Sequence, residues 1–556
     1  MADIDLWHWA AYNVEHAGHK ADRPSNRLQA VEWMAGVADN QRGPAQLIRL
    51  PLVEMIVEHR AAQRHVFDVL KLVSALAESG LAFHPDFKLQ TYFSLLTPAE
   101  AEKALPASVE ANVEAWTGQR APPVDVQRLF ESLVSANRET QENVVQDNKL
   151  SPGEMLRSED VAALVAKLKT WVGDDSASAE NQHLLLRGLS FLAPVVAPGD
   201  GKALWDLVKD SVDLHQDTDP KLRALWGDVR AALGCDPLFS PQAPYLMLER
   251  FKGHTAQDEP IPGFVRIPAG PFTMGSKDDS DNQPNAKALI DAPFYIHRTP
   301  VTVAQFDAFV EDGGYTDTRA WWDKQGLAWR NGAFNSKITD INFQQHLARR
   351  GPELRQLPMD WSAQLPFQSR PVTGVTWFEA RAYARWLSAQ LQSQIKQNSD
   401  LDRYQVLLPT ELQWERAARA TSPTESDQRN WPWGNKEKEA EQAANLANQV
   451  GQPSAVGVYP PSSIGLYDMG GNVWEWQDNL YRPLKDGLVR LPKDHELTNL
   501  EEWEKTDRPT LRGGSWFNNP ELARCSFRYW NHPDGSGSNI GLRVVLSLPI
   551  SGGSGS

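Results

Sequence analysis

The spacing of apolar residues changes near residue 240, and this change restricts the chain to two different kinds of fold. Before that point, segments such as residues 51–80 repeat apolar residues three and four positions apart and end at a glycine that can cap a helix. After it, short strand-like pieces such as residues 263–276 alternate with brief helical patterns and long loops. The pattern therefore predicts an all-α N-terminal region followed by an α+β domain.

The domain boundaries follow from the residues between these two parts. Proline becomes frequent over residues 237–261 and the helical spacing stops there, which is typical of a linker. We expect an α-helical region at residues 1–236 and an α+β domain at residues 262–550. A chain of 556 residues exceeds what one hydrophobic core usually supports, which agrees with this division. Residues 551–556, SGGSGS, are typical of an appended flexible linker.

Charge and composition argue against several kinds of partner. A net charge of −15 and a pI near 5.4 oppose attraction to phosphate backbones, so we expect no nucleic acid partner. No run of about 18 uncharged apolar residues is present, and the start of the chain lacks the pattern of a signal peptide, so we expect no membrane association. The two cysteines, Cys235 and Cys525, are too few for a disulfide framework. These features together predict a cytoplasmic protein.

Three helix starts in the second half can be predicted from their capping residues. In a capping box, a threonine is followed three residues later by Glu or Gln, and each side chain bonds the other residue's backbone N–H. The three pairs are Thr302 with Gln305, Thr376 with Glu379, and Thr410 with Gln413. Fourteen of the 21 tryptophans lie after residue 250, and large rings of this kind can anchor loop-rich structure.

Seven short motifs follow one another in the second half of the chain. They read GFVRIPAGPFTMGS, RPVTGVTWFEARAYARWLS, LLPTELQWERAARA, WPWGN, GLYDMGGNVWEWQDN, LRGGSWF and NIGLRVV. In this order they resemble the formylglycine-generating enzyme, or sulfatase-modifying factor, superfamily over residues 262–548. The resemblance implies a compact variant of the C-type lectin fold for these residues. It does not extend to the N-terminal half.

The resemblance also implies where an oxidase site would lie. In catalytic members, two cysteines bind copper(I) and activate oxygen, three and eight residues after a Gly-Gly-Ser turn, since soft thiolates suit this ion. Those positions are Asn518 and Ala523 here. Cys525 lies two residues later than the second of them and has no partner cysteine in this half of the chain. We therefore expect a domain without the oxidase site and predict no catalytic residue.

A second branch of the family leaves an enzymatic alternative open. Proteins resembling ergothioneine and ovothiol synthases join this fold to an N-terminal helical domain that holds iron through closely spaced histidines and an acid. The expected H-x3-H-x-E spacing is absent here. The remaining candidate ligands in the N-terminal half are His8, Glu15, His16, His19, Glu58, His59 and His65. Isolated histidines at such spacing are more often ordinary surface residues.

The last segment, residues 513–544, also resembles the variable region of proteins that are diversified by retroelements. In those proteins, mutagenic reverse transcription replaces adenines, mostly in asparagine codons, and leaves a frame of fixed residues that ends in a motif like NIGLRV. The resemblance implies a ligand-binding surface within residues 517–538. Its predicted members are Phe517, Asn519, Glu521, Leu522, Ser526, Phe527, Tyr529, Trp530, His532, Gly535, Ser536 and Ser538.

The residue types agree with that scheme in part. Replacement of the first two adenines of an asparagine codon can yield Phe, Leu, Ser, Tyr, His or Gly, but never Trp or Glu, so Trp530 and Glu521 depart from it. Rigid aromatic rings among Gly, Asn and Ser form a mixture that protein-binding loops favour. The alternative is that these aromatic rings pack the core and that Arg528 and Arg543 form structural ion pairs.

One metal site follows from the resemblance. The family binds a structural calcium ion at a segment like YDMGGNVWEW, where Asp468 and Glu475 would supply side chains and Gly471 and Val473 would supply carbonyl oxygens. Hard oxygen ligands of this kind suit Ca²⁺. The alternative is that Glu475 bonds nearby loop groups without a metal. No other cofactor is expected.

The sequence thus predicts a non-catalytic protein that binds a protein or other macromolecular ligand through residues 517–538. Two alternatives stay open: a metal-dependent oxidase or non-haem iron enzyme of the groups named above, and a structural or regulatory protein whose aromatic rings are all buried.

Overall fold

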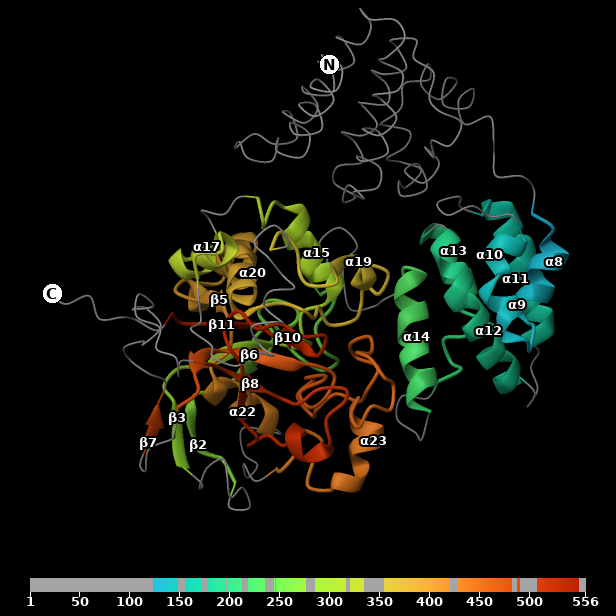
Figure 1. Cartoon of the computed structure of the whole chain (residues 1–556). Helices are drawn as coiled ribbons and strands as arrows, with labels where there is room; N and C mark the ends of the chain where they lie inside the picture. The colour runs from blue at the N-terminus through green and yellow to red at the C-terminus, as the bar shows by residue number, and fades with distance from the viewer. Residues whose placement is uncertain are drawn as a thin grey trace, which may run out of the picture. The chain divides into compact units, whose positions relative to one another are not determined.

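The computed structural model describes most of the chain after residue 123 (Figure 1). The described residues are 124–148, 156–172, 178–196, 198–212, 219–235, 245, 247–276, 286–316, 321–334, 355–420, 429–482, 488–490 and 508–549. The chain divides into two compact units. The helical unit comprises Met1–Ser211 with Val229–Cys235, and the C-terminal unit comprises Val212–Asp228 with Asp236–Ser556.

The described part of the helical unit contains helices and no strand, which confirms the predicted all-α character for that part. Its elements are α8 (Val126–Leu133), α9 (Arg138–Glu142), α10 (Val144–Asp147), α11 (Ser158–Val172), α12 (Ser178–Leu192), η3 (Ala193–Val195), α13 (Pro198–Trp205) and the end of α14 (Pro220–Ala232). Asp125 caps α8 by accepting hydrogen bonds from the backbone N–H groups of Gln127 and Arg128. Leucines three and four apart on α8, α11 and α12 are fully buried, so these helices pack through apolar stripes.

The candidate iron ligands all lie outside the described residues. They are His8, Glu15, His16, His19, Glu58, His59 and His65.

Three small sheets form the centre of the C-terminal unit. Their strand orders are β1-β4-β11-β5, β10-β6-β8-β9 and β2-β3-β7. The strands are β1 (Phe264–Ile267), β2 (Gly270–Met274), β3 (Ala286–Ile290), β4 (Phe294–His297), β5 (Gln405–Leu407), β6 (Trp474–Leu480), β7 (Leu488–Arg490), β8 (Pro509–Arg512), β9 (Tyr529–Trp530), β10 (Ile540–Leu542) and β11 (Val545–Ser547). The final strands β10 and β11 pair with β6 and β4, so the end of the described chain returns to the centre of the unit.

Helices surround these sheets, as Figure 1 shows for α15, α20 and α22. They are α15 (Val303–Glu311), α17 (Lys324–Arg330), α19 (Trp361–Gln364), α20 (Trp377–Gln390), α21 (Gln392–Gln397), η5 (Ser399–Leu401), α22 (Glu411–Arg419), η6 (Glu437–Glu439), α23 (Ala440–Ala443) and η8 (Pro520–Ala523). All three predicted capping boxes are present, at the starts of α15, α20 and α22, with both reciprocal hydrogen bonds in each. The mixture of helices and sheets confirms the predicted α+β class.

Tryptophan fills much of the core of the C-terminal unit. Trp377 and Trp386 on α20, Trp414 on α22 and Trp476 on β6 are each fully buried. Their ring N–H groups have partners: Trp377 donates to the Gln477 carbonyl at 3.0 Å and Trp414 to the Glu475 carboxylate at 2.6 Å. Large rings of this kind let short elements enclose a sizeable apolar core.

Residues before the predicted domain start also pack into this unit. Asp228 on α14 accepts two hydrogen bonds from Arg370, at 2.6 and 2.9 Å. The fully buried carboxylate of Glu259, within residues 247–261, lies 3.1 Å from Arg298. Among the described residues, no helix combines the length and apolar character needed to span a bilayer.

Candidate functional site

The predicted ligand-binding residues differ widely in exposure. Five of the twelve are exposed, three are half-buried and four are buried. The exposed residues are Phe517, Asn519, Glu521, Tyr529 and Ser538; the half-buried ones are Leu522, Phe527 and Trp530; and the buried ones are Ser526, His532, Gly535 and Ser536. The segment therefore presents part of its side chains to solvent and uses the rest for packing.

Four aromatic rings form a group that we call the aromatic platform: Trp474, Phe527, Tyr529 and Trp530. Trp474 is buried and supports it, with its ring centroid 5.4 Å from Tyr529 in a stacked arrangement and 6.1 Å from Phe527. The rings of Tyr529 and Trp530 lie nearly parallel, with centroids 5.9 Å apart. Tyr529 is 47% exposed, so its ring is held from one side and open to solvent on another.

Phe517 forms a second exposed aromatic position. It is 47% exposed and packs edge-on against Trp516, with ring centroids 5.2 Å apart. The Trp516 indole N–H donates to the Ser538 carbonyl at 3.3 Å, which connects the two ends of the predicted ligand-binding segment, residues 517–538. The exposed Phe517 ring therefore packs against a Trp516 ring that is itself held in place by a hydrogen bond.

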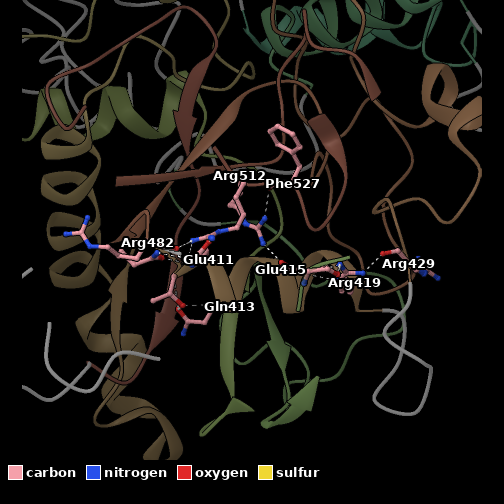
Figure 2. Close-up of polar contacts among 12 residues, drawn as sticks. Glu411, Gln413, Glu415, Arg419, Arg429, Arg482, Arg512 and Phe527 are labelled. Carbon is pink, nitrogen blue, oxygen red and sulfur yellow. Dashed lines mark hydrogen bonds and ion pairs between the residues drawn. The ribbon is translucent and has the colours of Figure 1, made fainter. Parts of the chain in front are cut away.

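Buried ion pairs from α22 hold the backbone beneath these side chains (Figure 2). Glu411 accepts two hydrogen bonds from Arg528, at 2.5 and 2.8 Å. One turn later, Glu415 pairs with Arg512, whose other nitrogen donates to the Phe527 carbonyl at 2.5 Å. Glutamates four apart share one face of a helix, so α22 holds Arg512 and Arg528 from the same side.

The electrostatics of Glu415 follow from this arrangement. Burial by itself would raise the pKa of this carboxyl, but the guanidinium groups of Arg419 and Arg512 outweigh that effect and hold the pKa below its usual value. Glu415 is therefore ionised at neutral pH and supplies countercharge for two buried arginines.

At the two positions where the family's catalytic members have copper-binding cysteines, this chain has Asn518 and Ala523. The Asn518 amide oxygen accepts from the Ser515 hydroxyl at 2.6 Å, and Ala523 is fully buried. Cys525 is fully buried as well, and burial raises the pKa of its thiol to about 12. Within the described part of the chain, no three His, Cys, Asp or Glu side chains gather as a metal site. A two-thiolate copper site cannot form from these residues.

The two side chains of the predicted calcium site already have partners within the chain. Arg543 donates to Glu475 at 2.8 and 3.0 Å, and its Nη2 atom also contacts the main-chain carbonyl oxygen of Asp468 at 3.2 Å. The Asp468 carboxylate accepts from the Gly457 N–H at 3.1 Å. Glu475 thus has its countercharge from Arg543, and these side chains do not fit a calcium ion without displacing that arginine. Calcium binding stays a prediction of the resemblance.

His297, which contacts Arg543 of this ion pair, leads to a prediction about the pH dependence of stability. Arg543 donates to the carbonyl of His297 at 3.0 Å, and burial, with the nearby Arg543 and Arg298 charges, lowers the pKa of the His297 imidazole from 6.5 to about 3. In the unfolded chain the His297 imidazole is protonated below about pH 6.5, whereas in the folded chain it stays neutral until a much lower pH. The free energy of unfolding should therefore fall as the pH drops below about 6.5, by up to about 1.4 kcal/mol per pH unit. Chemical denaturation of wild type and His297→Gln across about pH 5–7 measures this. Parallel pH profiles for the two proteins would contradict it.

Comparison with known proteins identifies the family. The family model described as "Sulfatase-modifying factor enzyme 1-like domain" matches residues 251–548. The chain belongs to this family. The match confirms the family predicted from the seven motifs, and the sulfatase-modifying factor enzyme 1-like domain contains every residue of the aromatic platform and of the buried ion pairs.

The chain is similar in sequence to proteins named hercynine oxygenase and formylglycine-generating enzyme. Hercynine oxygenase of Mycolicibacterium smegmatis is 34% identical over 276 residues, which cover 48% of this chain and 58% of that protein. Formylglycine-generating enzyme of Bos taurus is 29% identical over 315 residues, covering 52% of this chain and 76% of that protein. The chain spans only about half the length of the hercynine oxygenases that it matches.

Among solved structures, one similar chain is Treponema denticola variable protein 1. It shares 20% sequence identity with a TM-score of 0.34, and the match covers 51% of this chain and 95% of that chain.

Sequence reasoning missed two residues of the site. Trp474 supports the aromatic platform from β6, about forty residues before residue 513, although it lies in the motif GLYDMGGNVWEWQDN. Arg508 lies over Trp530 and precedes the segment altogether. No signal in the sequence pointed to Arg508, because its place beside Trp530 depends on the pairing of β8 with β9.

Proposed function

We propose that the chain is a non-catalytic binding protein whose sulfatase-modifying factor enzyme 1-like domain recognises a protein or other macromolecule through residues 517–538. The observation that carries this proposal is the exposure of Phe517 and Tyr529. Among the described residues, the only other exposed large hydrophobic side chains are Leu248 and Leu357. Cytoplasmic location and the lack of a nucleic acid partner stay predictions of the sequence.

Two physical features favour recognition at this surface. Rigid aromatic side chains lose little conformational entropy on binding and bury a large area, so they are frequent energetic centres of interfaces. The backbone next to Tyr529 is held by Arg528 and Arg512, which pair with Glu411 and Glu415, so a partner meets a pre-organised surface there. Asn519 and Ser538 supply exposed polar groups on the same segment.

We further propose that the exposed positions are diversified by a retroelement. The frame residues Gly513, Gly514, Arg528, Gly541 and Arg543 are buried. By contrast, Phe517, Asn519, Tyr529 and Ser538 are exposed and match the residues that adenine replacement can yield. Sequencing the native locus tests this: we expect a near-copy of the segment for residues 512–546, with mismatches confined to adenines, beside a reverse transcriptase. An intact locus without either element would leave binding to one fixed partner.

The binding proposal predicts a separation between affinity and stability. Replacing Phe517 and Tyr529 together with alanine should weaken partner binding roughly 30-fold or more, because each ring is a candidate hot spot. The melting temperature should change little, since about half of each side chain is already exposed. The measurement is affinity capture from the native organism with the immobilised full chain, followed by titration calorimetry of the captured partner.

Leu248→Ala is the matched control, because Leu248 is a similarly exposed apolar side chain (51%) outside the variable segment. A partner that binds wild type and the Leu248→Ala protein but not the double variant supports the proposal. Equal capture by all three proteins, or unfolding of the double variant, would rule it out in favour of a structural role.

An enzymatic function is the second candidate, and the 34% identity to hercynine oxygenase favours it. Under this hypothesis the chain would act with iron on hercynine or a related small molecule, and its metal ligands would include histidines outside the described residues. Oxygen consumption by the purified chain with iron(II) and hercynine tests the hypothesis. Turnover that disappears when His16 and His19 are replaced would support it over the binding proposal.

A further inference from the structure

Arg508 lies directly beside the aromatic platform. It precedes β8, whose Leu511 pairs with Tyr529 and whose Thr510 pairs with Trp530. Its guanidinium carbon lies 3.7 Å from the centroid of the Trp530 ring, and both side chains are half-buried. Stacking of this kind is a favourable cation–π contact, and it fixes the plane of the guanidinium group.

The charge of Arg508 has no counterpart among the described residues. The other arginines that anchor this part of the domain each pair with a buried carboxylate: Arg512 with Glu415, Arg528 with Glu411, and Arg543 with Glu475. For Arg508 no ion pair is found within the described part of the chain, and its Nε atom is buried without a hydrogen-bond acceptor.

The pKa directions agree with this contrast. Burial lowers the pKa of Arg508, and no carboxylate of the described residues offsets that effect. At Arg528 burial acts in the same direction, but pairing with Glu411 reverses it and raises the pKa above its usual value. Arginine stays charged in either case, so Arg508 is a fixed cation without an anionic partner among the residues that the structure describes.

We propose that Arg508 binds a carboxylate of the partner, namely an Asp or Glu side chain of a protein whose neighbouring apolar residue packs on Tyr529. The inference rests on the proposed binding function and names the chemistry of the partner. Arg508 lies outside residues 517–538, so it would be a constant contact beside positions that vary.

The geometry suits a carboxylate for two reasons. A guanidinium group can donate two parallel hydrogen bonds to a carboxylate, and these charge-assisted bonds are among the stronger ones in proteins. Stacking on Trp530 has already ordered the side chain, so less conformational freedom is lost on binding. The net charge of −15 does not prevent the contact, because exposed charges more than about 10 Å away are largely screened at physiological salt.

The test uses a random peptide library displayed on phage and selected against the immobilised full chain. Peptides selected by wild type should be enriched in Asp or Glu next to an apolar residue. Arg508→Gln should bind synthetic versions of these peptides roughly 10- to 100-fold more weakly. Arg403→Gln is the matched control, because Arg403 is exposed, has no described partner and precedes β5. It should leave the affinity unchanged.

Two further variants keep the result interpretable. Arg508→Lys keeps the charge and most of the packing but loses the planar pair of donors, so we expect an intermediate affinity. Selection against Arg508→Glu should instead enrich Lys or Arg at the same peptide position. This reversal of preference is not expected if Arg508 only stabilises the fold.

The outcomes separate this inference from the proposed function. Peptides that depend on Phe517 and Tyr529 but carry no acidic residue, or that bind Arg508→Gln as tightly as wild type, would overturn the role of Arg508 and leave the binding surface in place. A selection that yields no peptide sensitive to the Phe517 and Tyr529 double variant would count against both.

Discussion

Replacing Glu415 with alanine is expected to lower the free energy of unfolding of the C-terminal unit by about 3–5 kcal/mol. Glu415 is fully buried, accepts from Arg419 at 2.8 Å and from the Gly275 N–H at 2.7 Å, and pairs with Arg512. Its removal leaves two buried guanidinium groups without their carboxylate, which costs far more than the loss of one contact. Denaturant unfolding of the full chain, followed by tryptophan fluorescence, measures the change.

Glu439→Ala provides the comparison for Glu415. Glu439 forms an ion pair with Lys436 at 2.9 Å, but both side chains are well exposed, so its removal should cost less than about 1 kcal/mol. If both variants lost the same small amount of stability, water or other acceptors would have to satisfy the arginines, and the buried pairs would not hold residues 517–538 in place.

Replacing Trp474 with alanine should have an effect of similar size. Trp474 is 3% exposed and lies beneath Tyr529 and Phe527, so truncation leaves a cavity under the aromatic platform and should cost about 3–5 kcal/mol. Because Tyr529 then loses its support, partner affinity should fall even at temperatures where the variant stays folded. Thermal melting and calorimetric titration together measure the two effects.

A double-mutant cycle separates the support of Tyr529 from general destabilisation. If Trp474 acts through stacking, the Trp474→Ala and Tyr529→Ala changes should be coupled by about 0.5–1.5 kcal/mol in the free energy of unfolding. Trp474→Phe, which keeps a ring below Tyr529, should retain part of this coupling. Strict additivity of the two alanine changes would show that the stacking contributes nothing.

Local patterns were sufficient to predict much of the fold. The capping boxes at Thr302, Thr376 and Thr410 involve residues three apart, so the sequence alone specifies both partners, and all three helices begin where predicted. The helices of the described part of the N-terminal region also followed from short-range spacing, and the family followed from motifs that occur in a fixed order.

The surface could be predicted only in part, because exposure depends on distant contacts. Phe527, Tyr529 and Trp530 are aromatic residues within four positions of one another, yet only Tyr529 is exposed, since β8 and Trp474 determine which side of each ring is covered. His532 has the same aromatic character in the sequence and is buried.

The buried ion pairs were harder to predict from the sequence than the exposed surface. Structural pairing of Arg528 and Arg543 was one of the alternatives, and the structure confirms it. Their acidic partners, however, precede them by 117 and 68 residues. Only the folded chain identifies Glu411 and Glu475 as those partners.

The hydrogen bond from Arg512 to the Phe527 carbonyl has a consequence for how the domain tolerates sequence change. Every amino acid offers the same main-chain oxygen, so this anchor survives whatever side chain occupies position 527. Arg528, a frame residue, likewise holds the chain next to Tyr529 in place through its ion pair with Glu411. A lineage could therefore exchange the chemistry that this surface shows to its surroundings many times over, while selection on folding acts on a separate set of residues.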